Sequence, residues 1–258
     1  MHALARFQQT IDEQLNGEDV EPALQPRLWW RDDSRGLHVV FHGTPNVFGF
    51  WELLELLASA EMAARLVRLE VSGPDEGVNG THEISLGSLV SPGREFPRLQ
   101  ELRVARNRPA EHNRRVLADE EVLASLLKLA PALEVLESPS APTSKFFESG
   151  APALHQLCID AGYDHHGFIR NYAASGEAFR VRCLEFGEYA ETYMEDFATL
   201  CTPIADYVSL FGSRGFDHVA QFVWRNPVAS PVEIAELRAL RPKNLAFQLV
   251  HSNAKWVR

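Results

Sequence analysis

The sequence predicts a curved α/β solenoid, in which parallel strands line the concave face and helices cover the convex face. Three observations carry this prediction. Short segments with the spacing apolar-x-x-apolar-x-apolar recur along the 258-residue chain. Five of them follow a proline at a constant distance, and helical patterns lie between them. Because one strand–helix unit cannot bury its apolar face alone, neighbouring units must stack into a continuous core.

The recurring segments are predicted to be short strands with one buried face, because their last apolar residues alternate with polar ones. The predicted strands are Gly36–Phe41, Leu66–Val71, Leu99–Val104, Leu133–Ser138, Leu154–Ile159, Val181–Phe186, Ala205–Leu210, Val219–Trp224 and Leu245–Leu249. Their central apolar residues are Leu69, Leu102, Leu136, Leu157, Leu184, Val208, Phe222 and Phe247. The step from Val208 to Phe222 is too short for a strand, a helix and a return. Gly212–Gly215 is therefore expected to form a hairpin or a turn without a helix.

Proline stands five residues before the central apolar residue in five of these segments. The pairs are Pro97/Leu102, Pro131/Leu136, Pro152/Leu157, Pro203/Val208 and Pro242/Phe247. Proline at this place ends a preceding helix and extends the chain into the strand, because it lacks an N–H and restrains the residue before it. The alternative is that unrelated strands happen to begin after a proline.

Four segments between the strands have the apolar spacing of helices, namely Phe48–Ala64, Ala118–Leu129, Thr192–Leu200 and Pro231–Leu240. Ser230 and Glu233 form a capping-box pattern at the start of the last one, with proline at its first helical position. The longest steps between strands are expected to hold insertions, which are Pro74–Pro92, with an extra strand at Glu83–Leu89, and Arg106–Leu117.

One segment carries a family resemblance. Residues 99–107 read Leu-Gln-Glu-Leu-Arg-Val-Ala-Arg-Asn, which meets the pattern L-x-x-L-x-L-x-x-N of leucine-rich repeats, including the asparagine. The chain from residue 36 to residue 252 resembles the leucine-rich-repeat superfamily in its degenerate, ribonuclease-inhibitor-like form, although most other copies lack the asparagine. The resemblance implies parallel strands on a concave face, helices on a convex face, and protein recognition as the commonest role.

The chain is expected to form a single domain overall. Residues 1–35 do not fit the repeat and are interpreted as an N-terminal cap, in which Trp29 and Trp30 cover the first repeat. Residues 36–258 are interpreted as the solenoid with a C-terminal cap, to which Trp256 contributes. A doubly wound α/β enzyme is the competing fold, but it needs longer apolar strands and a ligand loop at a strand end.

Residues between the apolar positions of each strand are expected to point to the concave surface. The candidate partner-binding residues are Glu70, Arg103, Glu137, Asp160, Glu185, Glu188, Tyr207, Phe211 and Arg225. Glu137, Asp160 and Glu185 are expected on adjacent strands, and no Lys or Arg occurs from Cys183 to Ser213. This predicts an acidic strip that would steer a basic protein. The alternative is a solvated surface that serves solubility.

Positive charge also clusters, because several arginines occur between Arg94 and Arg115. Arginine clusters can hold phosphate or nucleic acid, but Phe96 is the one aromatic residue in this stretch. Intramolecular pairing of these arginines with the acidic surface is the favoured interpretation. With a net charge of −10 over the whole chain, general binding to nucleic acid or to an anionic membrane is not expected.

The sequence favours a non-enzymatic protein-binding module in the cytoplasm, with no cofactor and no metal. A specific version is an immunity or inhibitor protein that neutralises a basic partner through the acidic concave face. The chain lacks a nucleophile elbow, a phosphate loop and a dinucleotide-binding fingerprint, and its three cysteines do not suggest a disulfide framework. A structural adaptor in a larger complex is one alternative.

The other alternative is a metal-dependent hydrolase. Asp164-His165-His166 resembles the Asp-His-His string of metal-dependent phosphoesterases, where it binds manganese, and Asp160 precedes it on the same predicted strand and loop. The further aspartates of that family are not found at convincing positions. A polar turn after a repeat strand is the simpler interpretation.

Overall fold

The computed structural model describes residues 2–15, 25–43, 49–73, 80–106, 113–161, 164–188, 200–242 and 244–250. Within them the chain is a mixed α/β protein built on a mostly parallel nine-stranded sheet. The strands of this sheet are β1 (Arg27–Asp33), β2 (Gly36–His42), β3 (Leu66–Ser72), β5 (Glu101–Val104), β7 (Val135–Ser138), β8 (Gln156–Asp160), β9 (Cys183–Gly187), β10 (Gln221–Arg225) and β11 (Ala246–Val250). A second sheet pairs β4 (Gly80–Ile84) with β6 (Asn113–Leu117) in parallel.

The strands of the large sheet follow one another in chain order, from β1 at one edge to β11 at the other. The β1–β2 hairpin is antiparallel and the other described pairs are parallel. In a doubly wound sheet the strand order reverses, and ligands bind at the reversal. The described strands show no such reversal, so the doubly wound alternative is wrong for this part of the chain.

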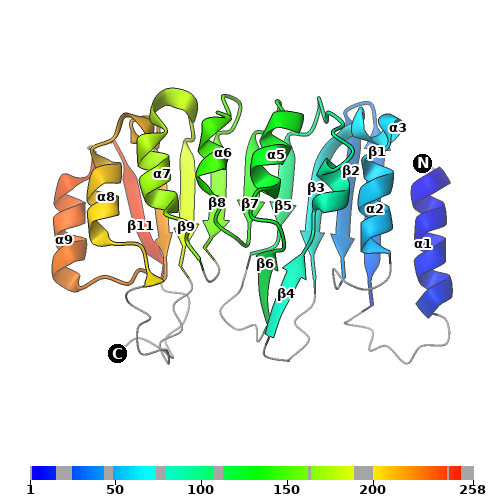
Figure 1. Ribbon diagram of the computed structural model, residues 1–258, viewed down its shortest axis with the longest axis horizontal. Helices are drawn as coiled ribbons and strands as arrows, with labels where there is room; N and C mark the ends of the chain where they lie inside the picture. Colours follow the sequence, from blue (N-terminus) through cyan, green and yellow to red (C-terminus); the bar gives the residue numbers. More distant parts are fainter. Residues whose placement is uncertain are drawn as a thin grey trace.

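Helices cover one face of the sheet (Figure 1). They are α1 (His2–Leu15), α2 (Phe50–Leu57), α3 (Ala60–Ala63), α4 (Gly87–Val90), α5 (Val122–Leu129), α6 (Ser144–Glu148), α7 (Phe168–Ala174), α8 (Ile204–Phe211) and α9 (Pro231–Leu240), with short 3₁₀ turns η1 (Gly176–Ala178) and η3 (Arg214–Phe216). The apolar core lies between this layer and the sheet. No helix in the described ranges is long and apolar enough to cross a membrane.

A continuous row of apolar residues, called here the buried ladder, crosses the sheet. The residues Val39, Leu69, Leu102, Leu136, Leu157, Leu184, Phe222 and Phe247 are Cα partners of one another in turn. All of them are fully buried except Phe247, which is half-buried in the edge strand. Since a slip of one residue would turn every side chain to the other face, the recurring pattern determines the register of these strands.

The prolines occupy turns that lead into strands. In the turns Phe96–Leu99, Ala130–Leu133 and Ala151–Leu154, the last N–H donates to the first carbonyl at 3.1 Å, with proline in second position. Proline suits this position because its fixed φ matches the turn. The carbonyl of Pro242 accepts instead from Leu245, one residue out of step. In four of the five predicted pairs, the proline therefore comes shortly before a strand, as expected.

The prediction is wrong for the pair Pro203/Val208, because Ala205–Leu210 lies in helix α8 and not in a strand. Pro203 is the residue before this helix, a position that proline also tolerates. Tyr207 and Leu210 are buried three residues apart, while Val208 is 43 % exposed. The short step that the sequence predicted is therefore part of one long unit from β9 to β10. Its turn region contains η3 rather than a hairpin.

Of the four predicted helices, Pro231–Leu240 is found with the same boundaries as α9, and two others are found shortened. Phe48–Ala64 is divided into α2 and α3, Ala118–Leu129 is reduced to α5, and α9 carries the predicted capping box of Ser230 and Glu233. Residues 192–199 of the predicted helix Thr192–Leu200 and Trp256 of the predicted cap lie outside the described residues. The first insertion contains β4 and α4 instead of a strand at Glu83–Leu89.

Candidate functional site: the open face of the sheet

The face of the sheet opposite the helices is called here the open face. Its middle row consists of the residues next to the buried ladder, and it runs Val40, Glu70, Arg103, Glu137, Cys158, Glu185, Val223 and Gln248. Polar residues stand at most of these positions, as expected for a face that helices do not cover. Glu70, Arg103, Glu137, Asp160, Glu185 and Arg225 all lie on strands of this sheet, Asp160 and Arg225 one residue beyond the predicted ends.

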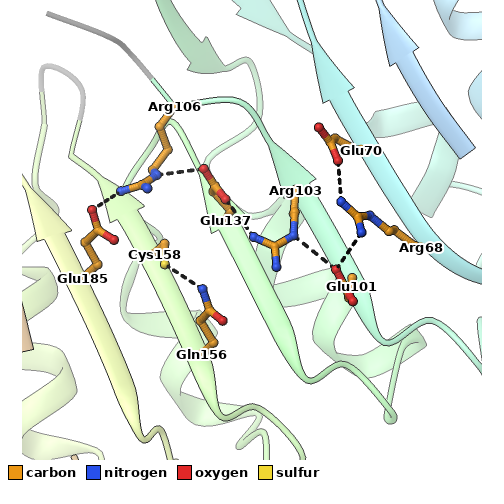
Figure 2. A network of polar contacts seen from close by, with 9 residues as sticks. All are labelled: Arg68, Glu70, Glu101, Arg103, Arg106, Glu137, Gln156, Cys158 and Glu185. Carbon is orange, nitrogen blue, oxygen red and sulfur yellow. Dashed lines mark hydrogen bonds and ion pairs between the residues drawn. The ribbon is translucent and has the colours of Figure 1, made fainter. Parts of the chain in front are cut away.

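Eight charged side chains on the open face form a continuous network of ion pairs, called here the charged network, and Figure 2 shows all of them except Arg225. Its members are Arg68, Glu70, Glu101, Arg103, Arg106, Glu137, Glu185 and Arg225. Starting on β3, Arg68 contacts Glu70 at 2.7 Å and Glu101 at 3.6 Å. Arg103 on β5 then joins Glu101 to Glu137, with an N–O distance of 3.2 Å to each.

Arg106 carries the network over two strands. It follows β5, and its guanidinium donates to Glu137 on β7 at 2.9 Å and to Glu185 on β9 at 2.7 Å. Burial acts to lower the pKa of Arg106, but its hydrogen bond to Glu185 and the nearby charges of Asp160 and Glu185 outweigh it and raise the pKa. Arg106 is therefore a permanent cation held in the middle of the face.

Glu185 is the acceptor at the other end of this bridge. Its Oε1 accepts from Arg106 and also from the Nε of Arg225 on β10. Burial acts to raise the pKa of Glu185, yet the hydrogen bonds from the two arginines outweigh it and hold the pKa below its usual value. The carboxylate is therefore charged at neutral pH although its side chain is only 13 % exposed.

Gly187 provides room for Asp160 beside the network. It is the Cα partner of Asp160 on β8 and of Arg225 on β10. A Cβ atom at residue 187 would lie 2.6 Å from the Oδ1 of Asp160, closer than carbon and oxygen can approach. A side chain at residue 187 would therefore displace the carboxylate of Asp160, whose charge acts on Arg106.

Cys158 lies beneath the bridge made by Arg106, between Glu137 and Glu185 in the row. Its side chain is buried and its Sγ accepts from the Nε2 of Gln156 at 3.6 Å. Burial raises the pKa of this thiol to about 11, so that the nucleophilic thiolate is scarce at neutral pH. Figure 2 shows the thiol among these groups. The hydrogen bond from Gln156 and the charge of Arg106 act to lower this pKa, but burial outweighs them.

Three residues that were predicted to bind a partner lie in the interior instead of on the surface. Glu188 is 5 % exposed, and its carboxylate accepts from the N–H of Thr202 at 2.5 Å and from the hydroxyl of Tyr207 at 3.1 Å. Tyr207 and Phe211 are buried on α8. For Tyr207 and Phe211 the error follows from the strand assigned to Ala205–Leu210. Glu188 directly follows β9 and turns inward, where it ties the segment before α8 to the end of that strand.

The predicted acidic strip needs a correction as well. Glu137, Asp160 and Glu185 do lie on adjacent strands, β7, β8 and β9. However, the charged network contains four arginines and four glutamates. The pairing of Arg103 and Arg106 with glutamates is the intramolecular neutralisation that the arginine cluster suggested. Glu191, Glu195 and Asp196 of the strip lie outside the described residues.

The predicted metal alternative finds no support in the placement of its side chains. Asp164 accepts from the backbone N–H of His166 at 2.7 Å, and the Nδ1 of His165 accepts from the N–H of Gly167 at 3.0 Å. These contacts close the turn before α7. Asp160 lies on the open face instead. Among the described residues, no group of three or more His, Cys, Asp or Glu side chains is arranged to hold a metal ion.

Sequence reasoning missed one exposed residue of the open face, Trp29. In the β1–β2 hairpin Trp29 is the partner of Val40, which places it beyond Glu70 in the middle row. Its side chain is 51 % exposed, whereas Trp30 points to the other face and packs against the core. The alternation of a strand separates adjacent residues in this way, so the two tryptophans do not act together as a cap.

No protein-family model, curated protein or solved structure matches this chain significantly.

Proposed function

We propose that this protein is a non-enzymatic binding module that recognises another protein with the open face of its sheet. We further propose that its strand–helix units form a leucine-rich-repeat-like curved solenoid with the strands on the concave side. Strands in chain order with helices on one face support this architecture, because each unit then packs only against its neighbours.

The charged network carries the proposal. Most sheets in mixed α/β proteins are covered by helices on both faces. Here one face instead displays paired arginines and glutamates across β3, β5, β7, β9 and β10. Mutual pairing fixes the side chains before a partner arrives, which lowers the entropy lost on binding.

The partner is recognised by its pattern of charges more than by its net charge. With arginines and glutamates in equal number, the network gives weak long-range steering and strong local complementarity. Trp29 adds a large apolar anchor at one end, and tryptophan is enriched among residues that dominate binding energy. An inhibitor or immunity protein that neutralises an enzyme by covering it would use such a surface.

Two tryptophans of similar exposure allow a matched test. Trp29 is 51 % exposed on the open face, and Trp51 is 55 % exposed on the outer side of α2. Immobilised wild type, Trp29→Ala and Trp51→Ala are incubated with lysate of the source organism, and retained proteins are identified by mass spectrometry. We expect a protein that wild type and Trp51→Ala retain and Trp29→Ala loses. Its dissociation constant should rise about tenfold or more with Trp29→Ala.

The charges are tested in the same way, with Arg68→Glu on the open face and Lys128→Glu on the exposed side of α5 as control. Arg68→Glu should weaken binding of that protein and Lys128→Glu should not. A partner that binds all four variants like wild type would place recognition elsewhere and would contradict the proposal.

A further inference from the structure

The two edges of the large sheet differ. At the β1 edge, the backbone N–H of Leu28 donates to the side-chain Oε1 of Gln8 on α1 at 3.0 Å. The same strand carries the charged residues Arg27, Arg31, Asp32 and Asp33. Charged side chains and a covering helix are common ways to prevent an edge strand from pairing with another chain. The β1 edge is therefore protected.

The β11 edge has neither form of protection among the described residues. Its sequence, Ala-Phe-Gln-Leu-Val, contains no charged residue. The N–H of Ala246 donates to Ala220 and the carbonyl of Val250 accepts from Asn226, so alternate residues of β11 bond towards β10. In a parallel pair the N–H and C=O of the residues in between point the other way. The backbone groups of Phe247 and Leu249 therefore point out of the sheet.

This edge is complementary to itself. If two β11 strands meet antiparallel about a twofold axis at Gln248, Phe247 of each copy faces Leu249 of the other. The outward N–H and C=O groups of these residues then form two hydrogen-bonded pairs, as in a regular antiparallel ladder. Ala246 faces Val250, and Gln248 faces its own copy, so no charge is buried. A twofold contact is isologous and closes at the dimer.

Apolar side chains at the same end of the chain favour such a contact. Phe247 stacks on Phe222 with a centroid distance of 5.5 Å, but Phe247 and Leu249 are only half-buried because no described strand follows. In α9, which precedes β11 in the chain, Val232 and Leu240 are 67 % and 53 % exposed. We infer that the β11 edge is a homodimer interface, in which a second copy of this chain continues the sheet.

Residue 248 provides a sharp test, because its side chain is exposed and lies on the proposed axis. The mass of the full chain in solution is measured by analytical ultracentrifugation over a range of concentrations. Wild type should reach twice the chain mass. Gln248→Glu and Gln248→Lys each place two like charges opposite one another, which should weaken the dimer about fivefold. An equimolar mixture of the two variants should restore association, because opposite charges then meet.

Exposed Gln100, in the turn before β5, provides the matched control, and Gln100→Glu and Gln100→Lys should associate like wild type. Circular dichroism verifies that all variants are folded. A wild-type chain that stays monomeric at all concentrations overturns the inference. That result is expected if another part of the chain occupies the β11 edge. A dimer that responds equally to changes at residues 100 and 248 overturns it too. Neither result bears on Trp29, so the proposed function is tested separately.

Discussion

At the scale of single residues, Glu185 shows how position decides the role of a side chain. It stands in a strand at a position that predicts an exposed, partner-binding acid. In the folded chain it is mostly buried and accepts hydrogen bonds from Arg106 and Arg225. Buried ion pairs add little net stability compared with apolar residues, but removing one partner is costly because it leaves the other charge unpaired.

Glu185→Gln should therefore destabilise the protein by about 2 kcal/mol at pH 7 in urea unfolding. Because the pKa of Glu185 in the folded state is below its usual value of 4.5, its charge stabilises the fold above pH 4.5. That contribution disappears as the pH falls through the folded-state pKa. The difference between wild type and variant should thus shrink between pH 5 and the acid limit of the fold, while a constant difference would contradict this role.

At the scale of elements, α8 shows where local patterns become ambiguous. The spacing of Ala205, Val208 and Leu210 fits a one-sided strand, but Tyr207, Leu210 and Phe211 fit a helix equally well. Packing decides between them, because the ring of Tyr207 lies 4.1 Å from that of Trp224, measured between centroids, and its hydroxyl donates to Glu188. These contacts join residues that are far apart in the sequence, so the spacing of nearby apolar residues cannot predict them.

The two interpretations predict different effects at Val208. In α8 its side chain is 43 % exposed, and alanine is the better helix former. Val208→Ala should therefore change the free energy of unfolding by less than about 0.5 kcal/mol. Leu210→Ala, which removes a fully buried side chain from the same helix, should cost about 2–5 kcal/mol. Comparable losses in both variants would favour a strand centred on Val208.

At the scale of the whole molecule, each strand–helix unit contacts mainly its neighbours in the chain. In such a stack stability is roughly a sum of units and their interfaces, and the end units have one interface each. Amide hydrogen exchange should therefore be slowest in β7 and β8 at the middle and faster in β11 at the edge, at protein concentrations where the chain is monomeric. Equal protection of all strands would show instead that the chain unfolds as one unit.

The sequence alone predicted eight of the nine strands of the large sheet, because a local apolar pattern repeats along them, but it missed β1 and added a strand at Ala205–Leu210. Within the strands that it predicted correctly, alternation along the chain also placed the residues of the open face. Tertiary structure decided the rest. Arg106 reaches across β7 and β8 to neutralise Glu185, and Glu188 turns inward to Tyr207, so the acidic strip became a paired network. These contacts depend on the distances between strands in the folded chain, and the order of residues in the sequence does not specify those distances.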